Sequence, residues 1–415
     1  MSRTPHRAAP LLRAWRNERG NAAILFALAT PVLLGGAGLA VETSFDYLSH
    51  SHLQSAADAA AYAAAIESMG GSDAATIRAA AAQQAGANGW ASSGGALTVN
   101  NPPTSGPNAG AANAVEVTLT STTPRFFTAF FTPQPLRIGV RSVAITQTAA
   151  NACILALNKT ASQAVNFQGN TTVNLNGCDV VSDSVATDGI NVWGSSIMSA
   201  DCAMSSGGVA NHGGMTLSGC SSPITQAPRV ADPFINLPTP TPGQHQNIPN
   251  GNPHGVQQLQ PGSYTSGMTL QGSVNLQAGV YYVSGGGFNI GSNAVVTGSD
   301  VTIYLAAGAN VTMNGSATVT LSAPSSGTYS GILFFGARNG TGINKFNGTP
   351  TSQMTGDIYF PSQEVDYQGN FSGQNGCTHV VADTVQWTGN SNIAVSCANM
   401  GMTPIPARQA VKLVE

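Results

Sequence analysis

The chain has 415 residues, of which only 8% are charged, and its formal net charge at pH 7 is −3. This weak, slightly acidic charge argues against a nucleic-acid-binding protein, because phosphate binding needs a basic surface. With 42% hydrophobic residues the chain is too apolar for a disordered protein, and its 48 glycines suit a β-rich exported protein with many tight turns.

The first predicted element is an apolar stretch at residues 21–41, which contains no charged residue. As a helix it would be about 30 Å long, enough to cross the hydrocarbon core of a bilayer. Five arginines precede it, whereas no basic residue follows until Arg78. By the positive-inside rule, we predict a cytoplasmic tail at residues 1–20, a single transmembrane anchor and an exported remainder.

A cleaved secretory signal is the alternative for this stretch. Gly38, Leu39 and Ala40 could form the small-x-small site that signal peptidase needs. Such signals usually have a shorter apolar region, of about 7–15 residues. We therefore interpret the stretch as an uncleaved signal anchor.

Residues 42–150 are predicted to form a small α+β module. Alanine-rich sequence predicts a long helix to about residue 87, interrupted only near residues 70–72. After a loop rich in Gly, Asn, Ser and Pro, residues 114–121 and 136–148 alternate between apolar and polar side chains. This period of two predicts two strands.

Four phenylalanines lie between these two strands, at Phe126, Phe127, Phe130 and Phe131. Rings at this density could face a lipid or a partner protein. We expect them instead to pack between the strands and the Ala-rich helix, because large apolar side chains are usually buried.

The N-terminal part resembles a known family. The sequence RGNAA at residues 19–23, the apolar run and LQSAADAAA at residues 53–61 are similar to the N-terminal module of TadE/TadG-like proteins. These proteins belong to the tight-adherence (Tad, or Flp) pilus-assembly machinery. The two strands around a Phe-Phe segment extend the resemblance over about residues 15–150. It implies a single-pass protein of the bacterial inner membrane whose partners are other pilus-assembly proteins.

The sequence departs from the family pattern in two places. Pilin-like members cleaved by prepilin peptidase carry Glu five residues after the cleavage glycine, and counted from Gly20 that position is Leu25. TadG-like members often carry a von Willebrand A domain whose metal site needs a DxSxS motif, which this sequence lacks. We therefore carry over no metal site and expect no cofactor.

Residues 151–226 and 256–400 are different in kind from the N-terminal part. Short V-x-L units, such as the one at residues 274–276, recur between glycine or asparagine turns. The sequence LQPGSY at residues 259–264 returns as LQAGVY at residues 276–281. Short strands at a repeated spacing, without helical periods between them, favour a parallel β-helix, with a β-sandwich as the alternative.

Two further segments complete the chain. Residues 227–255 contain seven prolines, a composition typical of an extended linker or of a long excursion from a solenoid. The sequence leaves these two interpretations open. Residues 401–415 are expected to form a tail without strands.

Six cysteines lie on the predicted exported side, and their even number fits disulfides in an oxidising compartment. Successive intervals of 25, 24 and 18 residues, and of 20 for the last pair, are each close to one coil of the proposed solenoid. Residues one coil apart stack about 4.8 Å from each other, within the range of a disulfide. By spacing alone, Cys178–Cys202 is as good as its neighbours, but it would leave the outer two cysteines far apart. We predict the pairs Cys377–Cys397, Cys153–Cys178 and Cys202–Cys220.

Some β-helices are polysaccharide-cleaving enzymes, whose sites need several carboxylates in one groove. The densest acidic group is Asp357, Glu364 and Asp366, with Asp383 about one coil further on. Stacked coils could bring these four together, even around calcium. We interpret them instead as solvated turn residues, because such clusters are usually solvated.

The other ingredients of catalysis are sparse. His212 and His379 lack an obvious nucleophile partner. We therefore predict no catalytic, metal or cofactor residues and a non-enzymatic protein of Tad/Flp-type pilus assembly or anchoring, whose β-helical domain is periplasmic or extracellular. A surface glycan-binding adhesin and a polysaccharide-active enzyme remain the alternatives. Between residues 150 and 400 the basic residues are Lys159, Arg229, Arg338 and Lys345.

Overall fold

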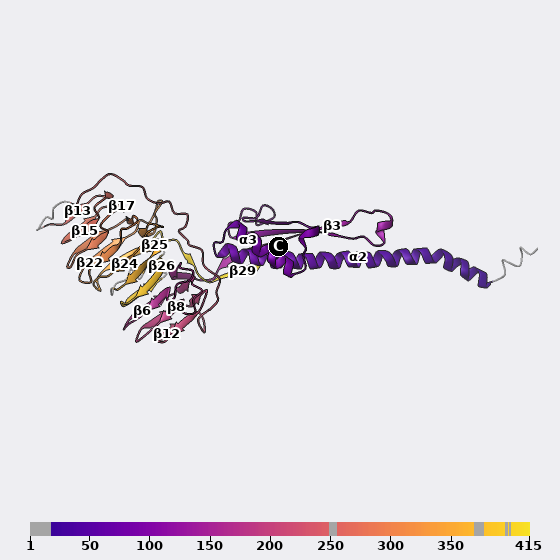
Figure 1. Cartoon of the computed structure of the whole chain (residues 1–415), viewed down its shortest axis with the longest axis horizontal. Helices are drawn as coiled ribbons and strands as arrows, with labels where there is room; N and C mark the ends of the chain where they lie inside the picture. Colours follow the sequence, from indigo (N-terminus) through magenta and orange to yellow (C-terminus); the bar gives the residue numbers. More distant parts are fainter. Residues whose placement is uncertain (1–17, 249–254, 369–376, 395–396, 398–399) are drawn as a thin grey trace, which may run out of the picture. The chain divides into compact units, whose positions relative to one another are not determined.

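The computed structural model describes residues 18–248, 255–368, 377–394, 397 and 400–415 (Figure 1). Most of the predicted cytoplasmic tail, residues 1–17, lies outside this part of the chain. The chain divides into two compact units. The first comprises Met1–Ala65, Ala74–Ile145 and Lys412–Glu415, and the second comprises Ile66–Asp73 and Thr146–Val411.

Helix α2 (Glu18–Met69) contains the predicted anchor and continues without a break into the alanine-rich sequence. Within the described residues it is long and apolar enough to cross a membrane, and the side chains of its most apolar part are not covered by protein. The helix ends where the sequence predicts, and α3 (Ala74–Ala87) follows. Gly71 makes the turn possible with a φ of 71°, a conformation that favours glycine.

A sheet of order β1–β2–β3–β29 completes the first unit. Gln54 of α2 donates a hydrogen bond of 3.1 Å to the carbonyl of Arg141 in this sheet. The alanines of α2 and α3 are buried because their small side chains allow close packing: Ala56, Ala57, Ala60, Ala61, Ala64, Ala65, Ala81 and Ala85. The strands are β1 (Leu97–Asn100), β2 (Ala114–Thr123), β3 (Leu136–Thr148) and β29 (Gln409–Leu413), and a short 3₁₀ turn, η1 (Ser92–Gly94), precedes them.

Glu116 is a buried carboxylate in this sheet. Burial tends to raise its pKa, but hydrogen bonds from Ser105, Asn100 and Arg141 outweigh burial and hold the pKa far below its usual range. Arg141 also pairs with the carboxylate of Glu415. The charge network therefore ties the last residue of the chain to the N-terminal module.

The prediction of a strand-free tail at residues 401–415 is wrong. β28 (Ile405–Pro406) pairs antiparallel with β4 (Asn151–Ala156), and β29 joins the sheet of the first unit. Strands this short carry too little periodicity to be seen in the sequence, and they form because a partner strand offers unpaired backbone groups.

The hairpin loop between β2 and β3 contains a short 3₁₀ turn, η2 (Thr128–Phe130), and the four phenylalanines. The expectation that these rings are buried between the strands and the Ala-rich helix is wrong. Phe126 is 55% exposed, Phe127 38%, Phe130 90% and Phe131 74%. The reason is the length of the hairpin, which extends past the Ala-rich part of α2 to its apolar part, where Phe127 meets Gly38.

The second unit is a parallel β-solenoid, so the β-sandwich alternative is wrong. Its strands pair in parallel with their counterparts one coil away, as in Val274↔Val296 and Val296↔Val319. Alternate side chains point inward and form one continuous apolar core. The rings of Tyr367 and Trp387, for example, stack inside it with centroids 4.2 Å apart.

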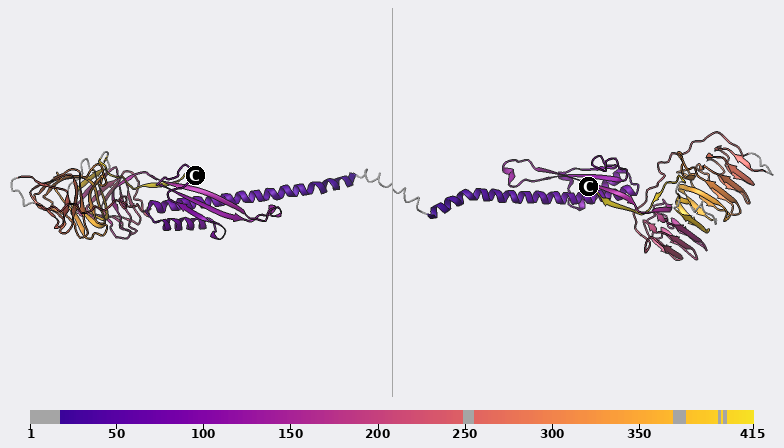
Figure 2. Two further views of the ribbon diagram at one scale, coloured as in Figure 1. Left: turned by 90° about the horizontal axis from the view of Figure 1, so that it is seen from above. Right: turned by 180° about the vertical axis from the view of Figure 1, so that it is seen from behind.

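The strands form three faces of the solenoid. Figures 1 and 2 show how successive coils stack along it. The first face contains β14 (Gly262–Tyr264), β17 (Gly279–Val283), β20 (Val301–Leu305), β23 (Ile332–Gly336), β25 (Gln353–Tyr367), β26 (Thr378–Trp387), β4, β7 (Asp179–Ser182) and β10 (Ala203–Ser205). The second contains β15 (Met268–Leu270), β18 (Phe288–Ile290), β21 (Val311–Met313), β24 (Ile343–Phe346), the later parts of β25 and β26, β5 (Val165–Phe167), β8 (Ile190–Val192) and β11 (Val209–Asn211). The third contains β13 (Gln257–Leu259), β16 (Ser273–Leu276), β19 (Val295–Gly298), β22 (Thr318–Ser322), β27 (Ser391–Ala394), β6 (Thr172–Asn176), β9 (Ile197–Ala200) and β12 (Gly214–Leu217).

The order of the coils does not follow the order of the sequence. β26, near the end of the chain, pairs in parallel with β4, so that Val380 lies beside Ile154. In Figure 1 the yellow strand β26 accordingly lies next to the magenta strands β6 and β8. The chain therefore enters the solenoid in its middle, and the two predicted repeat parts form one domain.

The Pro-rich segment is an excursion along this solenoid. On the first face, outward-pointing rings of Tyr282, Tyr304, Phe335 and Tyr359 form a column in which neighbouring centroids are 5.0 to 5.3 Å apart. Phe234 of the Pro-rich segment packs edge-on against Tyr359, 5.1 Å away. The segment thus covers an apolar column that would otherwise face water.

The structure pairs all six cysteines in the predicted set, including the two pairs that spacing alone left open. The Cα atoms of Cys153–Cys178, Cys202–Cys220 and Cys377–Cys397 are 5.6, 5.4 and 5.3 Å apart. Cys153–Cys178, for example, joins two neighbouring coils, because Cys153 lies in β4 and Cys178 directly precedes β7.

Candidate functional site

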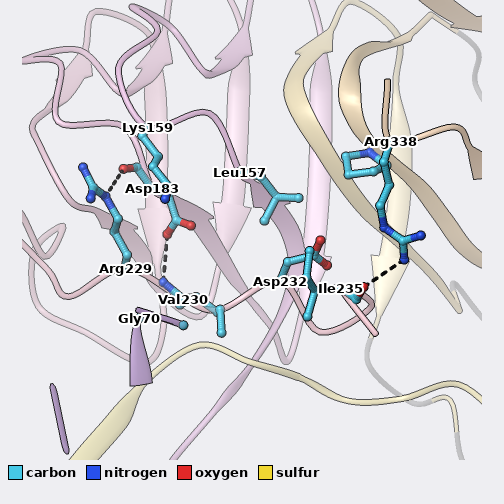
Figure 3. A pocket seen from close by; sticks show the side chains of 12 residues that line it. Gly70, Leu157, Lys159, Asp183, Arg229, Val230, Asp232, Ile235 and Arg338 are labelled. Atoms are coloured by element: carbon cyan, nitrogen blue, oxygen red, sulfur yellow. Dashed lines mark hydrogen bonds between the residues drawn. The ribbon is translucent and has the colours of Figure 1, made fainter. Parts of the chain in front are cut away.

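A pocket of about 360 Å³ lies on the solenoid where the Pro-rich segment begins (Figure 3). All the residues that line it belong to the second unit. They are Gly70, Gly71, Leu157, Lys159, Asp183, Arg229, Val230, Ala231, Asp232, Ile235, Arg338 and Pro361.

The floor of the pocket follows from the parallel register of the coils. Leu157 and Asp183 each come directly after a strand of the first face, β4 and β7. The backbone amide of Leu157 donates to the carbonyl of Ala382, and that of Asp183 donates to the carbonyl of Ala156. Equivalent positions on successive coils therefore stack in one column, although they are far apart in the sequence.

The opposite wall is the first part of the Pro-rich segment. The backbone amide of Val230 donates to the Asp183 carboxylate at 2.8 Å, and Arg229 Nε donates to the Asp183 carbonyl at 3.2 Å. The Val230 side chain is buried in the apolar cluster on the first face. A single aspartate thus fixes the start of the segment against the solenoid, as Figure 3 shows.

Arg338 fixes the same segment further along. Its guanidinium donates to the carbonyls of Phe234, Ile235 and Leu237 at 2.9, 3.0 and 2.8 Å. The guanidinium also lies over the ring of Phe335, 5.3 Å from its centroid. Because Nη2 is bound to these carbonyls, Arg338 helps to shape the pocket wall.

Three of the four basic residues between positions 150 and 400 line this pocket: Lys159, Arg229 and Arg338. Asp183 and Asp232 are the acids beside them. Burial raises the pKa of Asp183 to about 7, although the Val230 amide and the two nearest bases act in the opposite direction. Burial also raises the pKa of Asp232.

This arrangement is suited to binding a small anion. Within the described part of the chain, the Lys159 ammonium has no carboxylate within 4.0 Å. Leu157, Val230 and Ile235 add apolar surface next to the cationic groups. A ligand with one negative charge and an apolar body would match both the charge and the lining.

The four acids predicted as a group are only partly brought together. Burial raises the pKa of Glu364, and the nearby charges of Asp366 and Asp383 raise it further. Asp383 accepts hydrogen bonds from the Asn158 amide at 3.0 and 3.1 Å. Asp366 is itself buried, so the interpretation of these acids as solvated turn residues is wrong for this carboxylate.

Asp357 lies in β25, apart from the other three acids, and is fully buried, so the interpretation as a solvated turn residue is wrong for Asp357 as well. Its carboxylate is 3.0 Å from His379 Nδ1, and burial raises the pKa of Asp357 despite this contact. His379 Nε2 is 3.8 Å from the sulfur of Cys397, which is paired with Cys377. His379 thus has a carboxylate and a sulfur beside it, which the sequence did not reveal. Among the described residues no group of three or more His, Cys, Asp or Glu could hold a metal ion.

A comparison with known families concerns helix α2. Residues 20–68 match the family model of putative Flp pilus-assembly TadE/G-like proteins. The match begins just before the apolar stretch and ends one residue before α2 does. No curated protein and no solved structure matches the chain.

The TadE/G-like segment is followed by a β-solenoid. The sequence predicted this segment but no pocket: in it Lys159, Arg229 and Arg338 are only sparse bases, and Asp183 and Asp232 are not singled out. One feature of the sequence could have indicated the pocket: Arg229 and Asp232 are charged residues in a Pro-rich stretch that is otherwise poor in charge. Their convergence with Lys159 and Arg338 depends on the order of the coils, which no local pattern reveals.

Proposed function

We propose that this protein is a non-enzymatic component of Tad/Flp-type pilus assembly or anchoring. In this proposal α2 holds it in the bacterial inner membrane with its N-terminus in the cytoplasm and its solenoid in the periplasm or at the cell surface. The observation that carries the proposal is the TadE/G-like match over residues 20–68, which coincides with a helix that is apolar enough to span a membrane. The arginines before the helix support the orientation.

The solenoid would act by binding. The pocket at the start of the Pro-rich segment combines cationic and apolar groups, and Lys159 and Arg229 line it. Such a surface can recognise an anionic group on another component of the assembly. The proposed partners are therefore the inner membrane and other pilus-assembly proteins.

A deletion strain tests the role in pilus assembly. We expect the strain to show few pili and weak adherence, and expression of the wild-type chain to restore both. A Lys159→Met/Arg229→Met variant should restore them incompletely, whereas Lys345→Met, which changes a base outside the pocket, should restore them fully. Normal piliation and adherence in the deletion strain would overturn the proposal.

A reporter fused after Ser49 tests the orientation. A reporter that is active only outside the cytoplasm should be active, because the fusion point follows the apolar stretch. Activity of a cytoplasm-specific reporter at this position would contradict the orientation. The mass of the mature protein separates an uncleaved anchor from a signal cleaved after Ala40.

Binding of a surface glycan is a second candidate function. On the second face of the solenoid, outward amides form a row in which Asn191 donates to Asn166 at 2.8 Å and Asn166 donates to Gln386 at 3.3 Å. Near one end of this row Trp193 is 56% exposed. Asn166 and Asn191 are buried and bond to each other, so the exposed indole of Trp193 is the group of this set that can stack on a sugar ring. Loss of cell adhesion in Trp193→Ala with normal pilus counts would favour this function, whereas glycan cleavage abolished by Asp366→Ala would favour a polysaccharide-active enzyme.

A further inference from the structure

The hairpin between β2 and β3 ends in a loop of exposed aromatic rings, residues 126–131, which we name the Phe loop. Phe130 and Phe131 are the most exposed of its four phenylalanines, and their centroids are 5.4 Å apart. Exposed rings at this density are unusual on a surface that faces water. Their position suggests what covers them.

The Phe loop lies directly against α2. A Cβ atom at Gly38 would overlap the ring of Phe127, so the loop contacts the helix where a glycine leaves room. The ring of Phe126 packs edge-on against Phe45 at 5.0 Å. Figures 1 and 2 both show the hairpin running along α2 toward the N-terminal end of that helix.

A carboxylate on α2 fixes this position. Glu42 accepts hydrogen bonds from the Thr128 amide at 2.6 Å, from the Thr128 hydroxyl at 2.5 Å and from the Phe126 amide at 3.3 Å. The Glu42 side chain is buried by these contacts. The loop is therefore held at a defined height on the helix.

That height coincides with the end of the apolar stretch. Gly38 lies four residues before Glu42, which is about 6 Å along a helix with a rise of 1.5 Å per residue. On α2 the side chains of Leu34, Leu39 and Val41 are exposed at the same level. The rings of the Phe loop thus continue the apolar surface of the predicted membrane span.

We propose that the Phe loop inserts into the lipid leaflet at the C-terminal end of the α2 span, with its rings among the acyl chains. The occupant is lipid because the loop lies beside a helix surface that lipid itself must cover. Arg125 and Arg137 flank the rings, and no acidic residue occurs between Glu116 and Asp179. Two bases beside apolar rings suit the phosphate level of a bilayer.

Insertion would give the exported module a second membrane contact beside the helix. A helix alone leaves the attached module free to rotate about its axis, whereas a loop inserted beside it limits tilt and rotation. The hydrogen bonds of Glu42 transmit this constraint from the loop to α2. This inference depends on the proposed membrane span of α2, and the experiment below separates the two.

Fluorescence quenching by brominated lipids tests the proposal. The full chain is reconstituted in phosphatidylcholine nanodiscs with or without bromine on the acyl chains, and the emission of the four native tryptophans is subtracted. Phe130→Trp places an indole in the loop. Leu33→Trp reports on the span itself, and Tyr62→Trp is the matched control on the same helix, at a half-exposed position about 30 Å past Glu42.

We expect Phe130→Trp and Leu33→Trp to show blue-shifted emission that brominated lipids quench, and Tyr62→Trp to show neither effect. Red-shifted, unquenched emission from Phe130→Trp beside a quenched Leu33→Trp would place the loop in water and overturn the proposal. Blue-shifted but unquenched emission from Phe130→Trp would mean that protein covers the loop and would overturn it as well. If Leu33→Trp is also unquenched, the membrane span itself is refuted and the insertion falls with it.

Discussion

Replacing Arg338 should release the Pro-rich segment from the solenoid. This side chain donates hydrogen bonds to three carbonyls of the segment, those of Phe234, Ile235 and Leu237. Arg338→Met retains the length of the stem but removes all three bonds. All three carbonyls accept from Nη2, and Nη1 donates to the Thr239 hydroxyl at 3.2 Å; Arg338→Lys retains the charge but has one nitrogen in place of these two.

The expected magnitude follows from these contacts. A hydrogen bond to a charged group contributes about 1.5–3 kcal/mol, and bonds from one guanidinium are not additive. The Ile235 side chain is exposed, so freed carbonyls at this point of the segment regain bonds to water. We therefore expect Arg338→Met to lower the free energy of local opening by about 3 kcal/mol, which is about a hundredfold in the opening constant. For Arg338→Lys we expect about tenfold.

Hydrogen exchange measured by mass spectrometry on peptides from residues 229–248 is the assay. The backbone amides of Ile235 and Leu237 bond to the carbonyls of Asp232 and Phe234, and these amides should exchange faster in the order wild type, Arg338→Lys, Arg338→Met. Lys345→Met is the control, because this exposed base lies outside the segment. Unchanged exchange in Arg338→Met would refute the reasoning, since the segment would then be held by its apolar contacts alone.

Three further changes have defined expected outcomes. Replacing Cys377 and Cys397 by Ala opens a loop of 20 residues and should lower the free energy of unfolding by about 3 kcal/mol. Peptide mapping of the wild type without reduction checks the pairing, and free thiols at Cys377 and Cys397 would contradict it. The pKa of Asp183 is raised to about 7, so the free energy of unfolding of the wild type should fall relative to that of Asp183→Asn as pH rises from about 4 to about 7. The fall should reach about 4 kcal/mol, and urea unfolding measures it. A difference that does not change with pH would contradict this. Because the pKa of Glu116 is lowered, Glu116→Gln should be destabilised at pH 7, with a gap to the wild type that narrows below pH 4.5; a constant gap would show that its charge is not involved.

Features that depend on local patterns can be predicted from the sequence. The apolar stretch, the alanine-rich helix with its break at Gly71 and the strands β2 and β3 are visible because each pattern repeats over several residues. The spacing of the cysteines was informative for a related reason, since a solenoid converts a sequence interval of one coil into a distance of about 5 Å. The match to the TadE/G-like family also rests on one continuous segment.

How distant segments meet is visible only in the folded chain. The pairing of β26 with β4 stacks the coils of the later repeat part ahead of those of the earlier one, so the chain between the two parts must return along the solenoid, and the Pro-rich segment does this. This order of the coils also brings Lys159, Arg229 and Arg338 to one pocket, although Arg229 and Arg338 are more than a hundred residues apart in the sequence. The exposure of the Phe loop was misjudged because composition reports that rings are apolar and not which solvent they face. Whether the Phe loop faces water or lipid depends on where along α2 it is held. The contacts of the loop with Glu42 and Gly38 show this position, and they are not visible in the sequence.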